Sequence, residues 1–134
     1  MKGKTVFTNG CFDILHRGHI EYLQQSRDLG DKLIVGINSD ASVKRLKGNN
    51  RPINNQDDRK FILESLSCVD EVIIFDEDTP LELIHQVKPD VITKGGDYKP
   101  RDVVGFGIVN ELYIITFRDG YSTTNVIERI KNET

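Results

Sequence analysis

Five short apolar runs, separated by polar loops or helical patterns, constrain the fold of this chain more than any other feature. The runs lie at 5–8, 32–37, 69–75, 90–93 and 112–117. Apolar strands that alternate with helices require right-handed crossovers, and hence a parallel sheet that is covered on both faces. The sequence therefore predicts an α/β fold, a Rossmann-like doubly wound five-stranded parallel sheet with helices on both faces, in one domain over residues 1–134.

The predicted helices carry expectations about their caps and buried faces. Asp40 is expected to cap a helix over 40–46, since a short acidic side chain can accept hydrogen bonds from free backbone N–H groups. The side chains expected to point inward are Phe61, Ile62 and Leu66 in a helix over 56–66, and Val126, Ile127 and Ile130 in a closing helix over 122–131.

Charge and composition exclude several classes of protein. The chain has 134 residues, 29% of them charged, and a formal net charge of -3, whereas a general nucleic-acid binder usually carries a basic excess. Its two cysteines, Cys11 and Cys68, are too few for a disulfide scaffold and lack metal-site spacing. No apolar run is long enough for an export signal or a membrane span, so we expect a cytoplasmic protein.

The segment after the first strand has the composition of an anion site. Gly10 permits a tight turn, and His16 and His19 are three residues apart at the expected start of a helix, where backbone N–H groups are free. Gly18 leaves space between the two rings. Two alternatives remain: one histidine caps the helix while the other packs in the core, or the pair binds zinc, for which a third ligand is missing.

Polar residues also follow the later strands, at the edge where parallel sheets bind ligands. Lys44 could reach a phosphate or form a surface pair with Asp40, and Arg51 could close over a site or remain solvated. Lys94 offers a positive charge beside two glycines that remove side-chain bulk, and Asp97 can accept sugar hydroxyls. The hydroxyl run Ser122, Thr123 and Thr124 could cap the last helix, form a second anion site, or do both.

The chain reads Thr-Asn-Gly-Cys-Phe-Asp at 8–13 and His-Arg-Gly-His at 16–19. Together these two segments resemble the signature of the HxGH nucleotidyltransferases. The resemblance implies that His16 and His19 contact the phosphates of a nucleoside triphosphate. It also implies that Asp13 helps to hold the loop or a phosphate-bound magnesium ion. One branch is similar along nearly the whole chain, the adenylyltransferase domains that make ADP-heptose; the matching stretches are 7–13, 45–48, 51–52, 77–80, 91–98 and 120–125.

That branch implies transfer of AMP from ATP to a sugar 1-phosphate, D-glycero-D-manno-heptose 1-phosphate, with release of pyrophosphate, for lipopolysaccharide precursors. Mg²⁺ would travel with ATP, the protein would be a homodimer without nucleic-acid or membrane partners, and a separate sugar kinase would act upstream. Two alternatives stay open. One is a cytidylyltransferase for a polyol phosphate such as glycerol 3-phosphate, and the other is a non-catalytic nucleotide-binding protein.

The resemblance and the residue pattern together assign roles to the site. The expected catalytic residues are His16, His19 and Lys44. The expected nucleotide-binding residues are Thr8, Asn9, Gly10, Cys11, Phe12, Asp13, Gly18, Asp40, Ser122, Thr123 and Thr124. The expected substrate-binding residues are Arg51, Lys94, Gly95, Gly96 and Asp97. No residue is assigned as a metal ligand.

Overall fold

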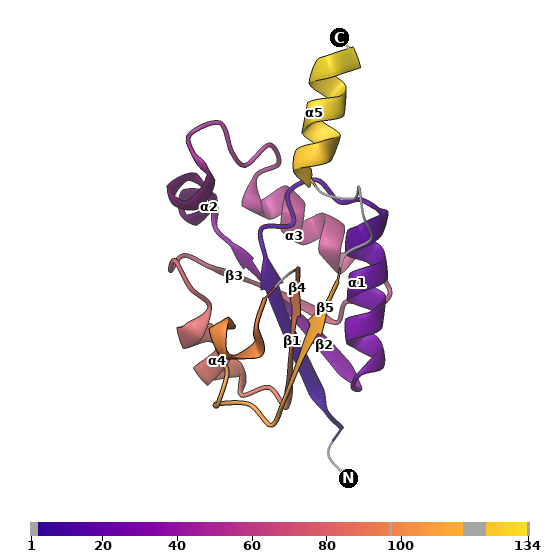
Figure 1. The fold of residues 1–134 in the computed structure, drawn as a ribbon, viewed down its shortest axis with the longest axis vertical. Helices are drawn as coiled ribbons and strands as arrows, with labels where there is room; N and C mark the ends of the chain where they lie inside the picture. The colour runs from indigo at the N-terminus through magenta and orange to yellow at the C-terminus, as the bar shows by residue number, and fades with distance from the viewer. Residues whose placement is uncertain (1–2, 97, 117–122, 134) are drawn as a thin grey trace.

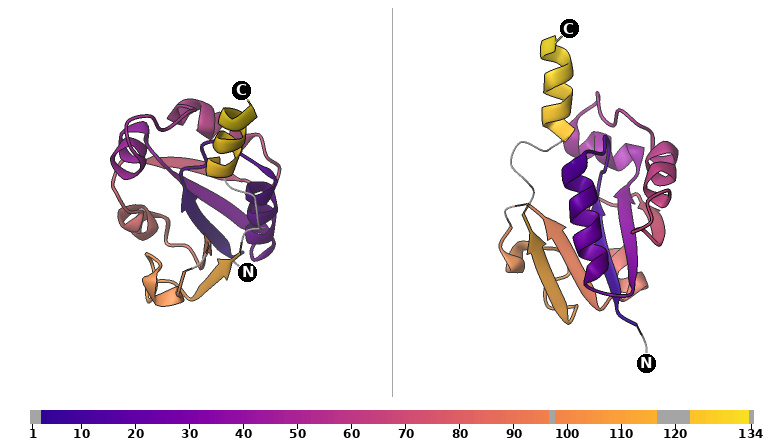
Figure 2. Two further views of the ribbon diagram at one scale, coloured as in Figure 1. Left: turned by 45° about the horizontal axis from the view of Figure 1, so that its top comes forward. Right: turned by 90° about the vertical axis from the view of Figure 1, so that its right-hand side faces the viewer.

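The computed structural model describes residues 3–96, 98–116 and 123–133 and shows a twisted parallel sheet with helices on both sides (Figures 1 and 2). The strands are β1 (Thr5–Gly10), β2 (Lys32–Asn38), β3 (Glu71–Phe75), β4 (Val91–Gly95) and β5 (Glu111–Ile115). All four pairings are parallel, in the order β3-β2-β1-β4-β5. The predicted fold class is confirmed. The strand order reverses between β1 and β4, which is where such sheets bind ligands.

Five helices and one short 3-10 turn connect and follow the strands in the described residues. They are α1 (Arg17–Asp28), α2 (Asp40–Lys47), α3 (Gln56–Glu64), α4 (Leu81–Val87), η1 (Pro100–Asp102) and α5 (Thr123–Glu133). In Figure 1, α5 projects beyond the sheet, at the end of the molecule opposite the N-terminus. Within these described ranges, no helix combines the length and the apolar character needed to cross a bilayer.

The core has two layers because successive side chains of a strand point to opposite faces. On one face, Val6 of β1 packs in a cluster with Leu23 of α1 and Leu63 of α3. On the other face, Phe7 packs in a second cluster with Ile84 of α4. Helices from both faces therefore hold β1, the central strand, and fix the loop that follows it.

Three expectations about the helices are wrong. Ser39, not Asp40, caps α2: its Oγ accepts a hydrogen bond from the Ser42 N–H at 3.2 Å. Helix α3 buries Arg59 and Leu63, four residues apart on one face, while Phe61 is 72% exposed and Ile62 is 40% exposed. Of the three side chains expected to point inward there, Leu66 alone packs against the core. In α5, Ile130 is 57% exposed and Ile127 is half-buried, and the side chain of Val126 lies outside the described residues. The errors in α3 and α5 came from assigning every apolar side chain to the interior, although large apolar residues also occur on protein surfaces.

Candidate active site

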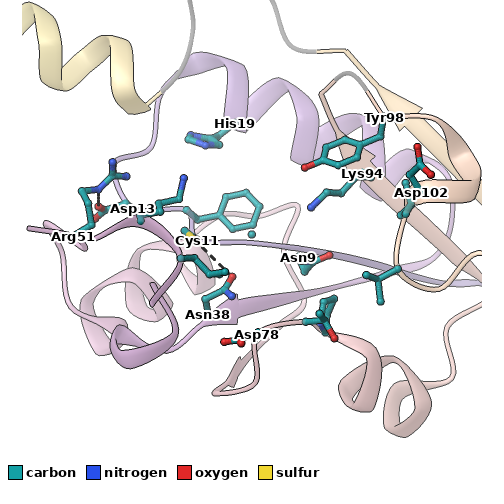
Figure 3. Close-up of a pocket in the computed structure, with 18 of the residues that line it drawn as sticks. Asn9, Cys11, Asp13, His19, Asn38, Arg51, Asp78, Lys94, Tyr98 and Asp102 are labelled. Carbon is teal, nitrogen blue, oxygen red and sulfur yellow. Dashed lines mark hydrogen bonds and ion pairs between the residues drawn. The ribbon is translucent and has the colours of Figure 1, made fainter. Parts of the chain in front are cut away.

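A pocket of about 520 Å³ opens at the carboxyl edge of the sheet, beside the point where the strand order reverses (Figure 3). Asn9 and Gly10 reach it from the end of β1, Asn38 from the end of β2, and Lys94 from the end of β4. The position follows from the fold, because the carboxyl ends of parallel strands meet at one edge.

His16 and His19 line the pocket as a pair. His16 precedes the first residue of α1, and His19 lies in its first turn. Their rings stack with centroids 3.9 Å apart, and the His16 backbone N–H donates to His19 Nδ1 at 3.2 Å. Since Nδ1 accepts this bond, a neutral His19 carries its proton on Nε2 and can donate from there. His16 thus occupies the capping position of α1 while both rings remain at the pocket.

The environment keeps both imidazoles neutral in the free protein. Burial lowers the pKa of His16. Burial, and then the neighbouring His16, lower the pKa of His19 to about 4. Near pH 7 the two rings therefore act as N–H donors and not as full charges. An anion bound beside them favours the protonated forms and opposes this shift.

Asp13 connects the loop after β1 to the loop between α2 and α3. Its carboxylate, 1% exposed, accepts hydrogen bonds from Arg51 Nε at 3.0 Å and from the backbone N–H groups of Ile53 and Asn54, each at 2.8 Å. Because these donors occupy both carboxylate oxygens, the geometry favours the loop-holding role of Asp13 over the magnesium role. Arg51 itself lines the pocket at this end (Figure 3).

The opposite end of the pocket combines a lysine, an aromatic ring and carboxylates. Lys94 Nζ lies 5.2 Å from the centroid of the Tyr98 ring, and burial lowers the pKa of Lys94. Tyr98 is 47% exposed, and Asp102, in η1, is exposed beside it. Figure 3 shows these three side chains at the end of the pocket remote from Arg51. Asp78 also lines the pocket, and its carboxylate accepts a hydrogen bond from Arg45 Nε at 2.9 Å.

The pocket brings together many of the residues expected from the sequence, but not all. Those that line it are Asn9, Gly10, Cys11, Phe12, Asp13, His16, His19, Arg51 and Lys94. Those in the described structure that do not line it are Thr8, Gly18, Asp40, Lys44, Gly95 and Gly96. Asp97 and Ser122 lie outside the described residues, as do the side chains of Thr123 and Thr124 at the start of α5.

Packing explains the main departures. The Thr8 side chain is fully buried and hydrogen-bonds to the Tyr22 hydroxyl and, at 3.1 Å, to the Thr93 carbonyl, so it supports the pocket floor and does not reach a ligand. Asp40 is turned to Arg59, 2.9 Å away. Lys44 is exposed on α2 outside the pocket, while Lys47, in the last turn of the same helix, lines it.

Several residues that line the pocket were given no role from the sequence, although Asn38, Lys47 and Tyr98 stand in segments that it placed at the ligand-binding edge. The residues without an assigned role are Asn38, Leu46, Lys47, Asp78, Thr79, Pro80, Tyr98, Asp102, Val103 and Val104. Residues 78–80 follow β3, so the rule that identified Lys94 could have identified them too. Residues 102–104 carried no comparable signal, because they lie between β4 and β5 and reach the pocket only through the path of that connection.

A family model described as Cytidylyltransferase-like matches residues 7–129. The chain is 63% identical over 131 residues to the "Bifunctional protein HldE" of Campylobacter concisus (strain 13826), and 59% identical over 128 residues to that of Helicobacter pylori (strain Shi470). These matches cover 98% and 96% of this chain, which spans 28% of the length of each of these relatives.

A solved structure of a lipopolysaccharide core biosynthesis protein from Thermoplasma volcanium GSS1 has the same fold. It superposes with a TM-score of 0.75 at 35% sequence identity, and the match covers 88% of this chain and all of the other. The likeness therefore extends through most of this chain.

Proposed function

The chain belongs to the cytidylyltransferase-like family, and from that premise we propose that it is a single nucleotidyltransferase domain over residues 1–134. Its reaction transfers AMP from ATP to a sugar 1-phosphate, D-glycero-D-manno-heptose 1-phosphate, and releases pyrophosphate. The observation that carries the proposal is the stacked pair His16–His19, which lines the pocket from the start of α1.

The paired histidines and the helix start suit the charge that develops in such a transfer. A phosphate oxygen of the acceptor attacks the α-phosphorus of ATP in line, a new P–O bond forms, and the bond to the β-phosphate breaks as pyrophosphate leaves. His16, His19 and backbone N–H groups at the start of α1 can donate to the phosphate oxygens. The reaction needs positioning and charge neutralisation, so no nucleophilic side chain is required.

Magnesium is best assigned to the substrate, as MgATP, because Mg²⁺ is commonly held by substrate phosphates. In the described part of the chain, no group of three or more His, Cys, Asp or Glu side chains could hold a metal ion. The Asp13 carboxylate, the residue nearest to such a role, is already occupied by the loop at 51–54. This arrangement fits a metal that arrives with its own phosphate ligands.

We assign the two ends of the pocket to the two substrates. The nucleotide end consists of Arg51, Lys47 and the two histidines, which supply donors for the triphosphate. The acceptor end consists of Lys94, Tyr98 and Asp102. There Lys94 supplies a charge for the sugar phosphate, while Tyr98 and Asp102 offer an aromatic face and an acceptor for sugar hydroxyls. The mixture of an aromatic ring and carboxylates at this end suits a polyhydroxylated acceptor better than it suits a second nucleotide.

Further parts of the proposal concern the setting of the enzyme. We place a sugar kinase upstream, since the transferase consumes an acceptor that already carries a phosphate. The name of the Thermoplasma relative, a lipopolysaccharide core biosynthesis protein, supports a role in making a lipopolysaccharide precursor. We also propose a homodimer in the cytoplasm, with small molecules and no nucleic acid or membrane as partners.

A pyrophosphate-release screen tests the proposal. ATP and CTP are each offered with D-glycero-D-manno-heptose 1-phosphate, other sugar 1-phosphates and glycerol 3-phosphate. Turnover is expected with ATP and the heptose phosphate. Better turnover with CTP and glycerol 3-phosphate would instead assign a polyol-phosphate cytidylyltransferase, and nucleotide binding without turnover on any acceptor would assign a non-catalytic binding protein.

A further inference from the structure

Arg59 is a fully buried charge whose bonds all go to segments that build the pocket. Its side chain, on α3, is 0% exposed. Nη1 donates to the backbone carbonyls of Cys11 at 2.9 Å and Asn38 at 2.8 Å, and Nε donates to the carbonyl of Asn54 at 3.0 Å. Nη2 donates to the Asp40 carboxylate at 2.9 Å. A buried guanidinium needs such partners, since an unpaired buried charge is strongly unfavourable.

The three carbonyls belong to three separate segments. Cys11 follows β1 and Asn38 ends β2, and both line the pocket. Asn54 lies in the loop that carries Arg51, and its N–H holds Asp13. The planar fork of one guanidinium therefore joins both strand ends and this loop, which the single ammonium of a lysine cannot do with the same geometry.

The bond to the Cys11 carbonyl also fixes the next peptide. The only cis peptide recorded in the described residues joins Arg51 and Pro52, so the 11–12 peptide is trans, and its carbonyl and the Phe12 N–H point in opposite directions. Phe12 has a φ of 47°, in the left-handed region that residues with a side chain rarely adopt. Arg59 holds the carbonyl on its own side and so turns the Phe12 N–H away from itself, while Phe12 lines the pocket.

We propose that Arg59 is a positioning residue for the nucleotide. From beneath the pocket it fixes the 11–12 peptide and the Arg51 loop, so that the Phe12 amide and the Arg51 guanidinium meet the same triphosphate. Arg59 touches no substrate itself, because its side chain is fully buried. The inference rests on the proposed transferase function for its kinetic test and on nucleotide binding alone for its spectroscopic test.

The kinetic test compares Arg59→Lys with Arg27→Lys. Arg27 is a matched control at the opposite edge of the sheet, where it donates to the Gly30 carbonyl at 2.8 Å and pairs with Asp70 at 3.0 Å. Arg59→Lys should lower kcat about 100-fold, as a small misplacement of reacting groups does, with a smaller change in KM for ATP. Arg27→Lys should lower the melting temperature only. A folded Arg59→Lys protein with wild-type kcat and KM would overturn the proposal.

A second measurement on the wild-type protein covers the case in which Arg59→Lys does not fold. NMR follows the Arg59 Nε–H, the Phe12 amide and the Arg27 Nε–H during titration with a non-hydrolysable ATP analogue. The Arg59 and Phe12 signals should shift together while the Arg27 signal stays in place. A shift of Phe12 with an unmoved Arg59 would overturn the proposal. This readout needs no acceptor, so it stands even if the screen finds no transferase turnover.

Discussion

The two ends of the pocket are built in different ways. At the nucleotide end, Asp13 holds Arg51 and its loop through several short hydrogen bonds, and His19 accepts a bond from the backbone of His16. At the acceptor end, Lys94 has a ring contact with Tyr98 but no ion pair within the described ranges, and Asp102 is exposed.

The difference is informative about how each substrate would be recognised. Donors held in place before binding lose little freedom when a triphosphate arrives, so they can stabilise charge in the transition state. Exposed side chains must be ordered on binding, and so they contribute less per contact but can adapt to a flexible polyol. We therefore expect substitutions at the nucleotide end to lower kcat, and those at the acceptor end to raise the KM for the sugar phosphate.

The largest effect is expected for His16→Ala and His19→Ala. Removal of one preorganised donor typically costs about 10²–10³ in kcat, and the loss should fall on kcat more than on KM. Steady-state kinetics and thermal melting measure it, with His85→Ala, exposed on α4, as the control. If both pocket variants stay folded with near-normal turnover, the catalytic end has been assigned to the wrong region; if both unfold, the histidines are structural.

The next effect tests the acceptor end. Lys94→Ala removes a charged hydrogen-bond donor, which is worth roughly 10- to 100-fold in kcat/KM for the sugar phosphate. Binding of ATP, measured by calorimetry, should be unchanged. Lys99→Ala, an exposed lysine outside the pocket lining, is the control. Weaker ATP binding with an unaltered KM for the sugar would move Lys94 to the nucleotide end.

The pH dependence of the free energy of unfolding tests whether the His19 ring at the nucleotide end is shielded from solvent. As pH falls below about 6.5, the unfolded chain protonates its histidines, whereas folded His19 stays neutral until its pKa of about 4. The stabilisation that the folded protein has with a neutral His19 is therefore fully present above pH 6.5 and is lost as pH falls toward 4. The difference between wild type and His19→Gln should change by about 2 kcal/mol from pH 8 to pH 5.

Denaturant unfolding at several pH values measures that difference, with His85→Gln as the matched substitution outside the pocket. Parallel pH profiles for wild type and His19→Gln would mean that the His19 ring is solvated and that the nucleotide end is as open as the acceptor end.

The smallest effect is expected for Asp102→Asn. A single exposed hydrogen bond is worth about 2- to 10-fold, so the KM for the sugar phosphate should rise by that factor while kcat is retained. The KM is measured with the heptose phosphate and with a smaller polyol phosphate. The KM for an acceptor that lacks the hydroxyl bound by Asp102 should not change in Asp102→Asn. An equal change for both acceptors would show that Asp102 acts through general charge and does not read a hydroxyl.

The sequence by itself determined the sheet, its position along the chain and the centre of the site. Apolar runs of strand length and the helical patterns between them predicted five parallel strands, because both signals are local. The histidine pair, Gly10 and Lys94 were found because each follows a strand, and parallel strands end at one edge. The family resemblance rested on the same contiguous segments.

Only the tertiary structure decided which polar side chains face the ligand and which support it. Thr8 and Asp40 are as polar as their neighbours, yet Thr8 is buried under the floor and Asp40 is turned to Arg59. Asp102 reaches the pocket through the connection between two strands. Arg59 lies 48 residues from Cys11 in the chain and 2.9 Å from its carbonyl. Such contacts depend on how distant segments pack, and no local periodicity or spacing encodes them.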